Sequence, residues 1–168
     1  MANKYGKVRL DLMHGTSNPA DLASVKYQVS GTDTAIENGN VVVVGGLITG
    51  EREVYAATAP TATSAKGTIA LIATPELIYD QSTHKNVNEF RNEAGEIARA
   101  YRLVTGDVFA ITIEAVAGRA DIASVVVGDI VELKAGTKLN VVATLTSDST
   151  QIGTVIAKEG DYVVIRVM

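Results

Sequence analysis

Three Gly-Asp pairs are the most regular candidates for chemistry in this chain. Gly106-Asp107, Gly128-Asp129 and Gly160-Asp161 each precede an alternating run of apolar and polar residues. A calcium loop needs several oxygen ligands within about a dozen residues, and no such cluster accompanies the three aspartates. Aspartate bonds nearby backbone and glycine accepts a positive φ, so the pairs predict turns without a metal ion or phosphate.

The histidines offer little further support for chemistry. His14 and His84 are the only two, and they stand in separate polar segments. Neither has a second histidine or a glutamate at the spacing of metal ligands. No Gly-x-Ser-x-Gly elbow accompanies them. We therefore expect solvated loop histidines, neither metal ligands nor catalytic bases.

Glu89, Glu93 and Glu96 form a close acidic set of the kind found in glycosidases. Paired catalytic carboxylates need an apolar pocket that separates their pKa values. These three share their stretch with Arg91 and Arg99, which predicts solvated ion pairs instead.

Phosphate and thiol chemistry lack a signature. Gly45, Gly46 and Gly50 do not form a Gly-x-x-x-x-Gly-Lys-Ser/Thr loop, and the chain contains no cysteine. Disulfides, thiolate zinc sites and cysteine nucleophiles are thereby excluded. The sequence predicts a protein that is not an enzyme, with no catalytic, cofactor-binding or metal-binding residues.

The elements that carry these residues are strands. In each Gly-Asp phrase, apolar side chains follow the aspartate at the second and fourth positions: Phe109 and Ile111, Val131 and Leu133, Val163 and Ile165. Period-two alternation after a turn predicts half-buried antiparallel strands, with Thr112, Glu132, Lys134 and Arg166 on the opposite face.

Further strands complete the predicted fold class. An Asn-Gly turn precedes Val41–Val44, and Glu51–Ala57 reads as the returning strand. From residue 97 onward we expect strands near 98–104, 107–115, 129–134, 138–146, 151–158 and 161–168. Short strands at close spacing predict a mainly β protein: an antiparallel β-sandwich or barrel with an extended N-terminal arm and little helix.

Three regions are expected along the chain. Residues 1–30 form the arm, with at most a short strand at Val8–Leu12, and Val25–Val29 alternates and could form a first strand. Such an arm is either disordered or ordered by a partner. Residues 31–96 form a β-rich region from which a small-residue loop (56–68) and a polar insertion (80–96) project. The insertion is either a helical turn or an irregular loop. Residues 97–168 form a compact antiparallel barrel or sandwich, unless residues 31–168 make one body.

Composition excludes two classes of partner. The 168 residues carry a net charge of −4, and only residues 1–30 have a positive balance, of +2. A nucleic-acid role normally needs a concentrated basic stripe, and stacking on single strands needs more than the eight aromatic residues present. No run approaches the roughly 18 apolar residues that span a bilayer. We expect no nucleic-acid or membrane partner.

A series of segments in the middle of the chain carries a family resemblance. In order they are Asn38-Gly39, Val41–Leu47, Gly50–Tyr55, Thr74–Asp80, Phe90–Gly95, Ile97–Tyr101 and Gly106–Thr112, and Gly160–Val167 closes the series. The series resembles capsid decoration, or cement, proteins of tailed bacteriophages, over residues 36–168. No single segment is specific; their order supports the resemblance.

The resemblance implies a structural role and no enzyme activity. A protein of this kind is made in the cytoplasm of the bacterial host and binds the outer surface of the virion. Its partner is the major capsid protein, and a homotrimer is the expected oligomer. Two alternatives remain open: an oligomeric all-β hydrolase with sites between subunits, and a carbohydrate- or receptor-binding β module. The absence of tryptophan weighs against the sugar-binding reading.

Overall fold

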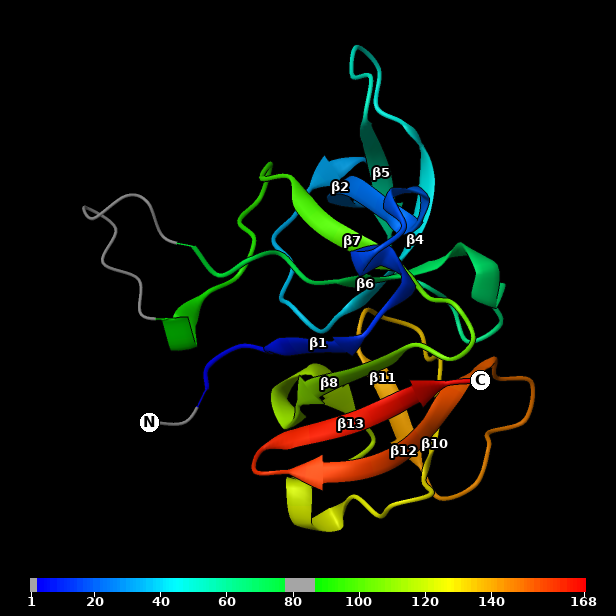
Figure 1. Cartoon of the computed structure of the whole chain (residues 1–168). Helices are drawn as coiled ribbons and strands as arrows, with labels where there is room; N and C mark the ends of the chain where they lie inside the picture. Colours follow the sequence, from blue (N-terminus) through cyan, green and yellow to red (C-terminus); the bar gives the residue numbers. More distant parts are fainter. Residues whose placement is uncertain (1–2, 78–86) are drawn as a thin grey trace.

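A computed structural model describes residues 3–77 and 87–168, and it confirms the mainly β class. Two sheets make up the molecule, a closed barrel and an open, curled second sheet beneath it in Figure 1. Helix is limited in these residues to 3-10 turns: His14–Thr16, Pro19–Asp21, Lys66–Thr68, Val87–Glu89, Ile113–Ala115 and Ile122–Ser124. None of the described helices is long and apolar enough to cross a membrane.

Five strands close the barrel. In spatial order they are β2 (Leu22–Val29), β5 (Val54–Thr58), β4 (Val41–Leu47), β6 (Ile69–Ile72) and β7 (Ala98–Arg102). Pairing of β7 with β2 completes the circle, and a short strand β3 (Thr32–Asp33) extends β2. Only the β2–β5 pair is parallel. Closure leaves these five strands without a free edge along most of their length.

Small side chains fill the barrel. The inward positions alternate along each strand, and the buried interior consists of Ala23, Val25, Ile36, Val42, Ala57, Ala70, Ile72, Ala98 and Ala100. Alanine dominates because a five-stranded barrel has a narrow interior. Longer side chains at these positions would overpack it.

The second sheet is open. Its spatial order is β1 (Val8–Leu12), β8 (Val108–Thr112), β13 (Tyr162–Val167), β12 (Gln151–Glu159), β10 (Ile130–Glu132), β11 (Leu139–Val142) and β9 (Val116–Ala117). The β11–β9 pair is parallel and the others are antiparallel. The strands expected from residue 98 onward are therefore present, with their ends moved by a few residues.

One core joins the two sheets. Phe109, Val131 and Val163 are fully buried on the concave side of the second sheet, as their alternation predicts. They share a cluster with Ile69 and Leu71, which point outward from the barrel. The wall of the barrel thus covers the open side of the second sheet.

The opposite face of the second sheet is less exposed than the alternation implies. Thr112 and Glu132 are 0% and 1% exposed, whereas Lys134 and Arg166 face solvent. The Thr112 hydroxyl accepts a hydrogen bond from the Lys7 N–H. Chain segments therefore cover this face locally, which alternation along one strand cannot reveal.

The extended N-terminal arm is not confirmed. β1 pairs with β8 in the second sheet, and β2 pairs with both β5 and β7 in the barrel. Gly6 packs so closely that an added Cβ would lie 2.5 Å from the Asn38 carbonyl oxygen. The apolar pattern is weak here for two reasons. One face of β1 is only partly buried, and the residues of β2 that point into the barrel include small ones such as Ala23.

The small-residue loop does not project freely. Its first part belongs to β5, and the turn that follows bonds to the second sheet. The Gly136 N–H donates to the Pro60 carbonyl at 3.3 Å, and the Thr150 N–H donates to the Ala62 carbonyl at 2.8 Å. This segment therefore links the two sheets.

The polar insertion is described only in part. Residues 80–86 lie outside the described residues, so the choice between helical turn and loop is open there. Val87–Glu89 forms a 3-10 turn, and Asn92 makes an isolated bridge with Ile36. The boundary expected at residue 97 precedes β7, which completes the barrel. The chain changes sheet between β1 and β2, and it returns to the second sheet between β7 and β8.

Candidate binding surface

Two of the Gly-Asp pairs form turns of the same geometry. Gly106 and Gly128 have φ values of 98° and 99°. The Asp107 carboxylate accepts the Val104 N–H at 2.9 Å, and the Asp129 carboxylate accepts the Val126 N–H at 2.9 Å. Positive φ at the glycine and a side-chain bond back to the third preceding residue are typical of a turn.

These turn aspartates are buried, and each has a second partner. The other Asp107 oxygen accepts the His14 N–H at 2.8 Å, and Asp129 pairs with the Arg119 guanidinium at 2.6 Å. Asp161 differs, because Gly160-Asp161 is the exposed two-residue hairpin between β12 and β13. No group of three or more His, Cys, Asp or Glu within residues 3–77 and 87–168 could hold a metal ion.

The other sequence candidates are dispersed. His14 is exposed, with Nδ1 3.4 Å from the Asp107 carboxylate, and His84 lies outside the described residues. Glu93 pairs with Arg91 at 3.0 Å, as predicted, whereas Glu89 lies 3.9 Å from Lys4. These contacts lie at the surface and do not bring the carboxylates into a shared apolar pocket.

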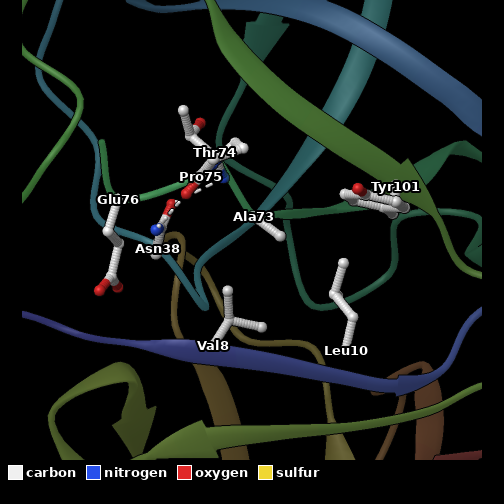
Figure 2. A pocket seen from close by; sticks show the side chains of 8 residues that line it. All are labelled: Val8, Leu10, Asn38, Ala73, Thr74, Pro75, Glu76 and Tyr101. Carbon is white, nitrogen blue, oxygen red and sulfur yellow. Dashed lines mark hydrogen bonds between the residues drawn. The ribbon is translucent and has the colours of Figure 1, made fainter. Parts of the chain in front are cut away.

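A cleft lies between the barrel and the second sheet. It has a volume of about 310 Å³, and Figure 2 shows its walls. The lining consists of Val8, Leu10, Asn38, Ala73, Thr74, Pro75, Glu76 and Tyr101. β1 forms the lower side in that view, and residues 73–76 and β7 form the upper side.

The polar wall of the cleft is held rigidly. The buried Asn38 amide donates to the Thr74 carbonyl at 2.9 Å and accepts the Thr74 N–H at 3.0 Å (dashed in Figure 2). Asn92 joins it by donating to the Ile36 carbonyl at 3.1 Å. Because both Asn38 groups are occupied, the amide positions Pro75 and Glu76 at the mouth of the cleft.

β1 presents a free backbone edge to one side of the cleft. The Thr112 N–H donates to the Lys7 carbonyl, which makes Lys7–Thr112 a hydrogen-bonded pair. Bonded and non-bonded pairs alternate in an antiparallel ladder, so the main-chain groups of Val8 and Leu10 point away from β8. β1 ends its sheet, and no described strand pairs with this edge. An added strand could bind there.

On the outer face of the barrel, three hollows of about 470, 190 and 470 Å³ share their linings. Ser24 and Arg99 belong to the first and second, and Thr74, Pro75 and Ile97 belong to the second and third. We call this chain of hollows the outer groove. Its full lining is Pro19, Leu22, Ala23, Ser24, Arg52, Glu53, Tyr55, Thr74, Pro75, Leu77, Phe90, Asn92, Glu96, Ile97, Ala98 and Arg99.

The two ends of the outer groove differ in character. One end holds the guanidinium groups of Arg52 and Arg99, with the Glu53 carboxylate beside them. The other end is apolar, with Leu77 59% and Ile97 50% exposed. Exposed apolar side chains rimmed by polar groups are typical of interaction surfaces.

Reasoning from the sequence did not find these surfaces. Arg99 was expected to pair with a neighbouring glutamate, but its side chain has no ion pair or hydrogen bond with a described residue. The alternation Ala98-Arg99-Ala100 does indicate one exposed position on a strand. Nothing in the sequence indicates that Ser24, Arg52 and Arg99 meet, because β2, β5 and β7 become neighbours only on closure of the barrel.

Comparison with known proteins adds no family assignment. No family model matches the chain, and no curated protein matches it.

Proposed function

We propose that this protein is a capsid decoration protein that binds the outer surface of a tailed-phage shell and stabilises it, as a homotrimer. One observation carries the proposal: segments that resemble the decoration family, though scattered in sequence, meet around the cleft and the outer groove. The residues from these segments are Asn38, Arg52, Glu53, Tyr55, Thr74–Leu77, Phe90, Asn92, Ile97–Arg99 and Tyr101.

The form of the surface supports this role. The cleft and the outer groove are open to solvent, and they combine exposed apolar side chains with a free strand edge. Each contact would contribute modestly, but a trimer on a symmetric shell repeats it. Linked weak contacts raise the total affinity by orders of magnitude without a deep pocket.

The direct test is binding to undecorated capsids of the phage that encodes the chain. We expect saturable co-sedimentation, a higher melting temperature of the shell, and a mass in solution of about three times the 17.6 kDa chain. A folded protein that never co-sediments with the shells contradicts the proposal.

Removing the first 24 residues is not a clean test. The deletion takes away β1 and the beginning of β2, so the second sheet loses an edge and the barrel loses part of its closure.

Point substitutions in the outer groove test shell binding without removing a strand. Ile97→Ser changes the apolar end of the outer groove, and Leu47→Ser changes a similarly exposed residue, 51% against 50%, outside it. Weaker shell binding by the first variant alone is the expected result.

A further inference from the structure

The outer groove lies on the part of the barrel that the second sheet leaves uncovered. Leu71 and Tyr101 point outward from β6 and β7 and are buried in the shared core. Ser24 and Lys26 point outward from β2, and Ser24 is exposed. The groove therefore remains open to a partner while the rest of the wall is occupied.

The pairing of the strands brings the basic end together. Ser24 on β2 is opposite both Val54 on β5 and Arg99 on β7, so these three residues form one row across the barrel. Arg52 stands two residues before Val54 and lines the same hollow. The structure thus aligns two arginines from distant parts of the sequence on either side of Ser24.

This end has a surplus of positive charge. Neither Arg52 nor Arg99 makes a side-chain hydrogen bond or an ion pair with another residue of the described ranges. Of the charged residues that line this hollow, Glu53 offsets one of the two arginines, which leaves a balance of +1. Guanidinium groups hold carboxylates through paired N–H donors, so a carboxylate fits this end best.

The neighbouring end suits an apolar side chain. Ile97 and Leu77 are half exposed, and Pro75 and Phe90 lie beside them. The polar part of the lining consists of Thr74, Asn92 and Glu96. Thr74 stands between the two ends, where its hydroxyl accepts the Arg99 N–H at 3.0 Å. This bond to the main-chain N–H of Arg99 continues the β6–β7 pairing beyond the end of β6 at Ile72.

We infer that the outer groove docks an extended acidic segment of a partner protein, with a carboxylate at Arg52 and Arg99 and an apolar side chain against Ile97 and Leu77. Three hollows that share lining residues suit an extended chain better than one compact molecule, which binds in a single pocket that buries most of its surface. The inference rests on the proposed function for the identity of the partner, an extended segment of the major capsid protein.

Peptides test the groove without any shell. The probes are the capped pentapeptides Leu-Ala-Ala-Asp-Asp and Asp-Asp-Ala-Ala-Leu, and the controls replace both aspartates with asparagine. Each is added to the full-length, isotope-labelled protein up to about 10 mM, which detects even weak affinity by NMR. We expect shifts at the amides of Ser24, Ile97 and Arg99, with the acidic peptide bound about two- to fivefold more tightly than its control.

Matched variants identify the contacts. Arg99→Gln should remove the preference for the acidic peptide, and Ile97→Ser should weaken both peptides. Arg166→Gln is the control, because Arg166 is also exposed on a strand but lies on the second sheet. Absence of shifts at the groove, or equal affinity for acidic and amide peptides, overturns the inference.

Shell binding separates the two proposals. If wild type and Arg99→Gln occupy shells equally, the decoration role stands and the groove is not the docking site. If the acidic peptide binds to the groove but the protein never binds to shells, the inference about the groove holds and the capsid protein is not the partner. Reduced occupancy by Arg99→Gln and Ile97→Ser, with Arg166→Gln unchanged, supports both.

Discussion

The barrel and the second sheet solve the problem of sheet edges differently. The barrel closes on itself and fills its interior with alanine and a few branched residues. The second sheet stays open, and it contains the buried carboxylates of the described chain: Asp107, Asp129 and Glu132. Each of them accepts main-chain or side-chain hydrogen bonds at a turn or loop.

This difference shows what an open sheet needs. Closure pairs most of the backbone of the barrel through ladder hydrogen bonds, whereas the open sheet uses buried carboxylates to hold its turns. Glu132 is an example of such a carboxylate. Its oxygens accept hydrogen bonds from the Asn140 amide and from both the hydroxyl and the main-chain N–H of Thr146. The open sheet also depends on Leu71 and Ile69 of the barrel for one side of its core.

The largest expected effect comes from removing a barrel side chain that packs in the core of the second sheet. Leu71 is fully buried and points from β6 into the shared core, so Leu71→Ala leaves a cavity between the two sheets. We expect the free energy of unfolding to fall by about 2–5 kcal/mol in a denaturant titration. Leu47→Ala, at a residue 51% exposed, should change it by less than about 0.5 kcal/mol. Equal effects would contradict a shared core.

A smaller effect distinguishes the buried turns from the exposed one. Asn in place of Asp107 turns an amide N–H₂ toward the N–H of His14 or of Val104, because both oxygens of the aspartate act as acceptors. We expect Asp107→Asn to lower the free energy of unfolding by about 1–3 kcal/mol. Asp161→Asn, in the exposed hairpin, should leave it within about 0.5 kcal/mol. Similar losses for both would show that the buried bonds contribute little.

The smallest effect is a pH dependence confined to the second sheet. Burial raises the pKa of Glu132, but hydrogen bonds from Thr146 and Asn140 lower it more, so the net pKa lies below the usual value for glutamate. A depressed folded-state pKa means that the stabilisation is present above the unfolded pKa and is lost as pH falls through the folded one.

Hydrogen exchange between pH 6 and pH 3, in steps of about one unit, would follow this loss. Amides of β10 and β11 should lose protection below about pH 4.3. Glu132→Gln should reduce the pH dependence, while barrel amides respond less in both proteins. Uniform loss of protection across both sheets would contradict the contrast.

Period-two alternation predicted most of the strands, including the inward positions of Phe109, Val131 and Val163. It allowed a short strand at Val8–Leu12, which is β1, but it did not predict that β1 and β2 belong to the two sheets and not to an extended arm. Alternation is weak where a strand buries small residues or only part of a face. The turn role of Asp107 follows from its type, but its bond to His14 joins segments far apart in the chain. The outer groove depends on β2, β5 and β7 meeting in one barrel, and local sequence carries no signal for that pairing.

The pairing of β1 with β8 also governs the order of events during synthesis. Lys7 and Thr112 are separated by 105 residues. At about 5–20 residues per second, the first strand waits roughly 5–20 s on the ribosome before its partner exists. Arg9 and Asp11 place opposite charges on that waiting strand. Charges on a strand edge oppose pairing with other chains, so a strand that carries Arg9 and Asp11 is suited to this delay.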